Sequence, residues 1–70
     1  MPSSAIRFFR YAPETRELKV AFASGRLYLY AEVPPEVATA FGNARSKGTF
    51  FNHEIRDRYA YRDITHEYAS

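Results

Sequence analysis

The chain of 70 residues contains no cysteine. No disulfide can therefore stabilise its fold, and a zinc site built on cysteine thiolates is excluded. Only His53 and His66 could supply nitrogen ligands to a metal, and His66 lies in a C-terminal stretch that we expect to fray. We therefore expect neither a metal site nor a cofactor.

Long apolar stretches are also missing. No run of the sequence approaches the roughly 20 residues that a membrane-spanning helix needs. The first residues lack the charged and apolar regions of a signal peptide. Because a cysteine-free composition also fits a reducing compartment, we expect a cytoplasmic protein with no membrane partner.

Aromatic side chains are abundant instead, with six Phe and six Tyr among the residues. A chain of this length forms one domain and buries only about 60% of its unfolded surface, so large rings suit its small core. The net charge of +2 permits a polyanionic partner without requiring one. Arginine outnumbers lysine, and arginine can fork onto phosphate or stack on a base. Surface arginines also commonly pair with neighbouring carboxylates, so this alternative stays open.

Alternation of apolar and polar residues predicts three strands. The clearest case places Leu18, Val20 and Phe22 on one face of a strand. Proline at position 13 favours a turn between the first two strands, and Gly25 favours a tight hairpin between the second and third. The predicted strands cover residues 4–11, 17–23 and 26–33.

Two helices are predicted after the strands. Consecutive prolines at 34 and 35 end the sheet and favour a helix over residues 35–41. Ser46 is a suitable N-cap for a second helix, which an apolar stripe of Phe51, Ile55 and Tyr59 extends to about residue 59. The predicted fold class is therefore α+β, with a three-stranded antiparallel sheet followed by two short helices packed on one face.

Short motifs recur in a fixed order along the chain. They are Ser4-x-Ile6, Leu18-x-Val20-x-Phe22, Gly25-x-x-Tyr28-x-Tyr30, Val33-Pro34, Ala44-x-Ser46-Lys47-Gly48-x-x-Phe51-Asn52 and Ile55-Arg56-x-x-Tyr59. This set resembles the KTSC domain, which is named for its occurrence at the C-terminus of some lysyl-tRNA synthetases and also forms stand-alone small bacterial proteins. The resemblance implies a single domain over residues 3–62, with a flexible tail over 63–70. The family has no established activity, and its synthetase context implies RNA or tRNA as a partner.

Tyr28 and Tyr30 form the first candidate site. Both point to the same face of the predicted third strand, where their rings could stack successive bases if that face were open. The alternative is that the helices cover this face and the rings belong to the core. The need of so short a chain for buried area favours the core.

The start of the second helix forms the second candidate site. Its unpaired backbone N–H groups are receptive to anions, Arg45 and Lys47 add positive charge, and Gly48 lets a phosphate approach the backbone. The alternative is an ordinary cap by Ser46 with Lys47 in solvent. We expect Lys47→Ala to leave the melting temperature nearly unchanged and to weaken the binding of any anionic partner.

Arg56 and Arg58 form a third candidate, a basic rim along the second helix. The alternative is that they pair with neighbouring acids, among them Glu54 at the favourable i, i+4 spacing from Arg58. Such exposed pairs contribute little stability individually.

A catalytic set is not found. Ser46 and Lys47 are adjacent on a helix and point roughly 100° apart, so they do not form a catalytic dyad. The sequence shows no Ser/His/Asp set, and no Gly-rich phosphate loop follows a strand. We therefore predict a non-catalytic binding module for RNA or another nucleic acid. The alternative is a protein-interaction or homodimerisation module that uses the exposed edge of the first two strands. The predicted nucleic-acid-binding residues are Tyr28, Tyr30, Arg45, Ser46, Lys47, Gly48, Arg56 and Arg58.

Overall fold

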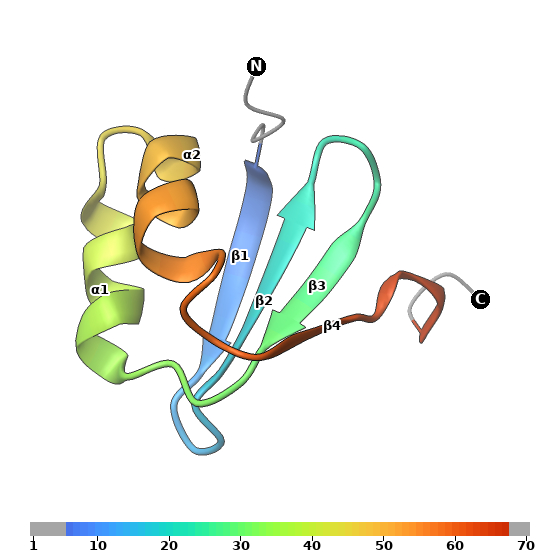
Figure 1. Ribbon diagram of the computed structural model, residues 1–70, viewed down its shortest axis with the longest axis horizontal. Coiled ribbons are helices and arrows are strands. Elements are labelled where there is room, and N and C mark those ends of the chain that lie inside the picture. Colours follow the sequence, from blue (N-terminus) through green and yellow to red (C-terminus); the bar gives the residue numbers. More distant parts are fainter. Residues whose placement is uncertain (1–5, 68–70) are drawn as a thin grey trace.

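A computed structural model describes residues 6–67 as an antiparallel sheet with helical segments packed on one face (Figure 1). The α+β class is confirmed, but the sheet has four strands in the order β1-β2-β3-β4, rather than three. The elements are β1 Ile6–Ala12, β2 Glu17–Phe22, β3 Leu27–Tyr30, α1 Pro35–Asn43, α2 Lys47–Phe50, the π-helical segment η1 Phe51–Ile55, β4 Tyr61–Asp63 and the 3-10 helix η2 Thr65–Glu67.

Strand β2 is the centre of the fold because it pairs with β1 on one side and β3 on the other. Its alternating residues Leu18 and Val20 are fully buried, as the sequence pattern predicts. The hairpin to β3 turns at Gly25, whose φ of 98° lies in the left-handed region that glycine adopts without strain. Strand β3 ends at Tyr30, earlier than predicted, because Glu32 takes a φ of 57° and turns the chain away from the sheet.

The fourth strand is the main difference from the prediction. β4 pairs with β3 antiparallel, and Tyr61 lies opposite Tyr30. The chain then stays on the sheet: Ile64 is only 1% exposed and donates its backbone N–H to the Leu27 carbonyl at 2.9 Å. The stretch from residue 63, expected to be a flexible tail, thus begins with residues that pack against the fold, while 68–70 lie outside the described residues.

The helical half begins as the sequence predicts. Pro34 is extended, and its carbonyl accepts hydrogen bonds from the first turn of α1. Ser46 is the predicted N-cap, and its hydroxyl oxygen accepts a hydrogen bond from the Thr49 N–H at 3.2 Å. The second helix is not one regular helix to residue 59: after four residues it widens into η1, where the Arg56 N–H bonds the Phe51 carbonyl five residues back.

The core lies between the helical segments and the sheet. Phe41 of α1 packs on Phe9 of β1, with ring centroids 4.4 Å apart, and Phe51 of η1 packs on Phe22 of β2 at 5.3 Å. In Figure 1, β3 and β4 form the part of the sheet farthest from α1. The helical layer therefore covers the β1–β2 side of the sheet more fully than the β3–β4 side, and a site can form at the edge of the layer. The core residues of this cluster are Leu18, Val20, Phe22, Tyr30, Val33, Phe41, Phe51 and Ile55.

Candidate binding site: the tyrosine groove

Tyr28 and Tyr30 lie on the helix-covered face of the sheet, because they stand directly opposite Val20 and Leu18. Tyr30 is 2% exposed and meets Phe51 edge to face, with centroids 5.5 Å apart. Tyr30 is thus a core residue, in agreement with the alternative in which the helices cover this face of the sheet. Tyr28 is half-buried and keeps part of its ring accessible.

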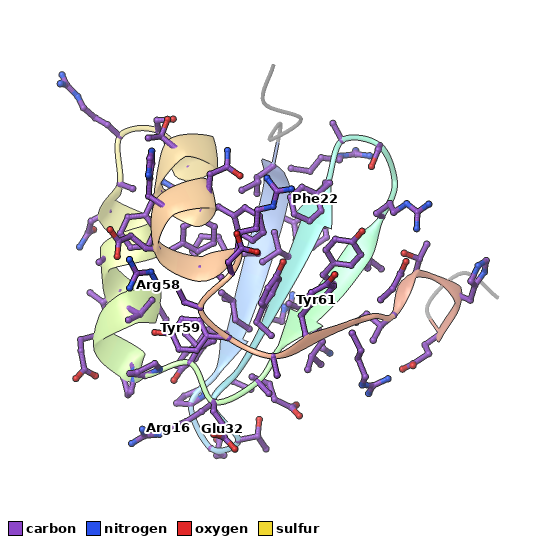
Figure 2. The ribbon with its side chains drawn as sticks, viewed as in Figure 1. Arg16, Phe22, Glu32, Arg58, Tyr59 and Tyr61 are labelled. Atoms are coloured by element: carbon purple, nitrogen blue, oxygen red, sulfur yellow. The ribbon has the colours of Figure 1, made fainter. Side chains whose placement is uncertain are left out.

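Strand β4 adds a third tyrosine that the sequence analysis did not single out. The ring of Tyr61 lies 5.4 Å from the ring of Tyr30, with planes 29° apart, and 5.4 Å from the ring of Tyr28. It is 57% exposed, and it is labelled on β4 in Figure 2. A large, exposed ring held by two neighbouring rings is a preformed stacking surface.

The three tyrosines line a groove with a volume of about 620 Å³ between β3–β4 and the end of η1. Its deep part is aromatic, since Phe22, Tyr30 and Phe51 are all buried. Its rim is polar, since the charged and amide side chains that line it are exposed. We call it the tyrosine groove; it is lined by Phe22, Ala23, Ser24, Arg26, Tyr28, Tyr30, Phe51, Asn52, Arg56, Asp57 and Tyr61.

The rim carries both signs of charge. Arg26 forms an ion pair with Asp63 at 2.8 Å. Within residues 6–67 the other ion pair joins Arg62 to Glu67, so Arg56 is not paired with a carboxylate. Burial raises the pKa of the Tyr30 hydroxyl, and Tyr61 and Tyr28 raise it further; Arg56 lowers it and Asp57 raises it by smaller amounts. Both charges therefore act on the interior of the groove.

The predicted site at the start of α2 is elsewhere. Lys47 donates from its ammonium group to the carbonyl oxygens of Ala44 and Gly42, at 2.9 and 3.1 Å. Ser46 caps the helix, and Arg45 is exposed. The tyrosine groove is lined by none of the four predicted residues of this helix start, Gly48 included.

Arg58 is also separate from the groove. Its Nε donates to the His53 carbonyl oxygen at 3.2 Å instead of pairing with Glu54. It lies beside Tyr59 in Figure 2. There it borders a second hollow, of about 610 Å³, and Asn52 and Asp57 line both this hollow and the groove. Of the eight predicted residues, the structure therefore brings Tyr28, Tyr30 and Arg56 together.

Two kinds of feature are absent from residues 6–67, the part of the chain that the structure describes. No group of three or more His, Asp or Glu side chains there could hold a metal ion. No helix there is long and apolar enough to cross a membrane.

A small antiparallel sheet with helical segments on one face and a tyrosine-lined groove at their edge defines a compact α+β module. The family model of the KTSC domain matches residues 2–59, and the chain belongs to this family. The crystal structure of a KTSC domain protein from Yersinia pestis has a similar fold, with a TM-score of 0.84 and 34% identity over 91% of this chain and 90% of that one.

Relatives occur both alone and within a larger enzyme. An uncharacterized protein of Stutzerimonas stutzeri is 42% identical over 59 residues, which cover 84% of this chain and 83% of the relative. A lysine–tRNA ligase of Nostoc punctiforme is 37% identical over 62 residues, which cover 89% of this chain. The match spans only 11% of that ligase, so it concerns a domain-sized segment of the enzyme.

Proposed function

We propose that this KTSC domain is a non-catalytic module that binds single-stranded RNA, with an unstacked base in the tyrosine groove. The observation that carries the proposal is the exposed ring of Tyr61, which stacks on Tyr30. It lines the same groove as Arg56, which pairs with no carboxylate among residues 6–67. Single-stranded nucleic acids are bound by this combination of aromatic ring and cation.

The dimensions and physics of the groove fit this ligand. A volume of about 620 Å³ lies within the range of sites for small organic groups, about 300–1,000 Å³. Stacking of a base on an aromatic side chain contributes about 1–3 kcal/mol per base and tolerates any base. Arg56 would contact the phosphate, because a guanidinium can fork onto its oxygens.

The relationship to a synthetase supports RNA as the ligand. A lysine–tRNA ligase carries a similar segment, and such an enzyme acts on a tRNA by its name. Arg45, at the start of α2, and Arg58, at the second hollow, are exposed cations outside the groove that a longer RNA backbone would contact. Lys47 contributes less, because its ammonium group already bonds two carbonyls.

An amide NMR titration of the protein with a short single-stranded RNA and with a tRNA tests the proposal. It should be run at about 50 and 200 mM salt, the range over which phosphate contacts weaken steeply. We expect shifts at Tyr28, Arg56 and Tyr61 that diminish at the higher salt. A spectrum that does not move at either salt would remove the RNA proposal, and shifts confined to residues 45–48 would move the site to the start of α2.

A second candidate function, self-association, rests on a different observation. β1 is an outer strand of the sheet, and its Phe8 is 60% exposed. β2 pairs on both sides, so the edge proposed from the sequence for the first two strands belongs to β1 alone. An open edge can pair with a second copy of the strand. Sedimentation over a range of concentrations tests this function, and a monomer at every concentration would count against it.

A further inference from the structure

We infer that the tyrosine groove prefers guanine, with Asp57 and Asn52 reading the hydrogen-bonding edge of the base that stacks on Tyr61. This inference rests on the proposed function and adds a base identity to it. Stacking alone does not distinguish bases, so any preference must come from the polar groups at the rim.

The rim offers few groups that are free to bond a base. The guanidinium of Arg26 already bonds Asp63 at 2.8 Å. Asp57 has an exposed carboxylate that lies in neither of the ion pairs found within residues 6–67. Asn52 is exposed beside it and lines the same groove.

The carboxylate of Asp57 determines how a nucleotide would enter. A negative carboxylate repels a phosphate, so the backbone of the strand lies toward Arg56 and the base toward the interior. An ionised carboxylate accepts hydrogen bonds and donates none. The edge of the base that meets Asp57 must therefore present donors.

Guanine is the base that meets this requirement with two adjacent donors. Its N1–H and its 2-amino group point the same way and can bond both oxygens of one carboxylate, as charge-assisted hydrogen bonds. Adenine and cytosine present one amino group beside an acceptor nitrogen, and uracil presents one N–H between two carbonyls. The remaining O6 acceptor of guanine suits the amide N–H₂ of Asn52.

The test compares four labelled RNA oligonucleotides that differ only in one central base, guanine, adenine, cytosine or uracil, flanked by uracils. Fluorescence anisotropy with the full chain measures each Kd at one fixed salt concentration. We expect the guanine oligonucleotide to bind about 10-fold more tightly than the others, a difference of about 1.4 kcal/mol. Asp57→Asn, which replaces one acceptor oxygen by a donor, should reduce that preference to about 2-fold.

Glu54→Gln is the matched control for charge. Glu54 is exposed on η1, three residues before Asp57, but does not line the groove, and its substitution makes the same change in net charge. It should keep the full preference for guanine. Equal effects of the two substitutions would show that Asp57 acts only through its charge, and would overturn the inference.

The outcomes separate this inference from the proposed function. Equal affinity for all four oligonucleotides, with NMR shifts in the groove, would overturn the guanine preference and leave RNA binding intact. Free guanosine and adenosine monophosphates form the last arm. Selective binding of guanosine monophosphate without binding of any oligonucleotide would support the recognition of guanine by Asp57 and remove the RNA proposal. Binding of none of these ligands would overturn both.

Discussion

The ammonium nitrogen of Lys47 lies 2.9 Å from the carbonyl oxygen of Ala44 and 3.1 Å from that of Gly42. Carbonyls at the end of a helix lack partners within the helix, and a cation there is favourable. Lys47 is the first residue of α2, so one side chain caps α1 and ties the two helices together. The sequence offered Lys47 as either a phosphate ligand or a solvated side chain, and neither describes these contacts.

Lys47→Ala should therefore lower the free energy of unfolding, by about 0.5–1.5 kcal/mol. This replaces the expectation from the sequence that the melting temperature would hardly change. The measurement is a urea denaturation with circular dichroism. Arg45→Ala is the control, because Arg45 is an exposed neighbour of equal charge. If both variants unfold at the urea midpoint of the wild type, the two carbonyl contacts contribute nothing to stability.

Thr65 anchors the end of β4 to β3. Its hydroxyl oxygen accepts a hydrogen bond from the Leu27 N–H at 2.9 Å. Thr65→Val keeps the shape of the side chain but leaves this N–H without its partner, which costs about 1–3 kcal/mol. In this variant we expect amide hydrogen exchange, relative to the wild type, to become faster at residues 61–64 by more than in the β1–β2 hairpin. His66→Ala, in the same 3-10 helix, should leave exchange unchanged; equal protection of β4 in both variants would contradict the anchor.

The same anchor predicts a loss of β4 in acid. Hydrogen bonds from the Thr65 hydroxyl and the Thr65 N–H, followed by Arg26, hold the pKa of Asp63 below its ordinary value. A lowered pKa in the folded state means that the stabilisation is present above the unfolded pKa, about 3.9, and is lost as the pH falls through the folded pKa. Amide protection of β4 should fall in that range of pH, and Asp63→Asn should remove the dependence. A protection that stays constant down to pH values below the folded pKa would contradict this role.

The buried hydroxyl of Tyr30 leads us to expect a loss of stability at alkaline pH. Burial raises the pKa of its hydroxyl, and its neighbours Tyr61 and Tyr28 raise it further. The folded state then holds the hydroxyl proton more tightly than the unfolded state does. The contribution of Tyr30 to stability is therefore complete below the unfolded pKa of about 10 and is lost as the pH rises toward the folded pKa. Each proton that the folded state retains and the unfolded state releases makes the free energy of unfolding fall by up to about 1.4 kcal/mol per pH unit.

Thermal denaturation between about pH 8 and 11, on either side of the tyrosine pKa, measures this effect. Tyr30→Phe keeps the buried ring and removes the ionising group, so its melting temperature should decline less with pH than that of the wild type. Tyr28→Phe, at a half-buried position on the same strand face, is the matched comparison. Parallel declines for wild type and Tyr30→Phe would show that other groups govern the alkaline transition.

Local signals in the sequence were enough for much of the fold. Alternation predicted the buried face of β2, the two prolines predicted the start of α1, and the serine at position 46 predicted the N-cap of α2. Each of these features depends on neighbouring residues only. Strand β4 has three residues, too few for a period to show, and it exists because β3 offers it an open edge.

The site was harder to predict because it is assembled from distant segments. Tyr28 and Tyr30 share a strand, and their common face follows from alternation. Tyr61 joins them only through the β3–β4 register, and Arg56 reaches the groove only because η1 ends where it does. The engagement of Lys47 by carbonyls from another helix is equally invisible in the sequence.

Tyr61→Ser tests the groove with little cost to the fold. The ring is 57% exposed on a short outer strand, so we expect a change in stability within about 1 kcal/mol. Affinity for single-stranded RNA should fall about 5- to 150-fold, the equivalent of a lost stacking contact of about 1–3 kcal/mol. Fluorescence anisotropy measures the affinity, and Tyr61→Phe, which retains the ring, should restore most of it.

Phe8→Ser is the comparison for Tyr61→Ser. Phe8 is 60% exposed on β1, at the opposite edge of the sheet, so the substitution removes an exposed ring of similar size away from the groove. It should leave RNA affinity unchanged and weaken self-association if β1 is used for that purpose. A loss of RNA affinity with Phe8→Ser but not with Tyr61→Ser would place the nucleic acid at the β1 edge. Equal losses from both would indicate that exposed aromatic rings bind RNA here without a defined site, because a groove-specific contact depends on where the ring is held.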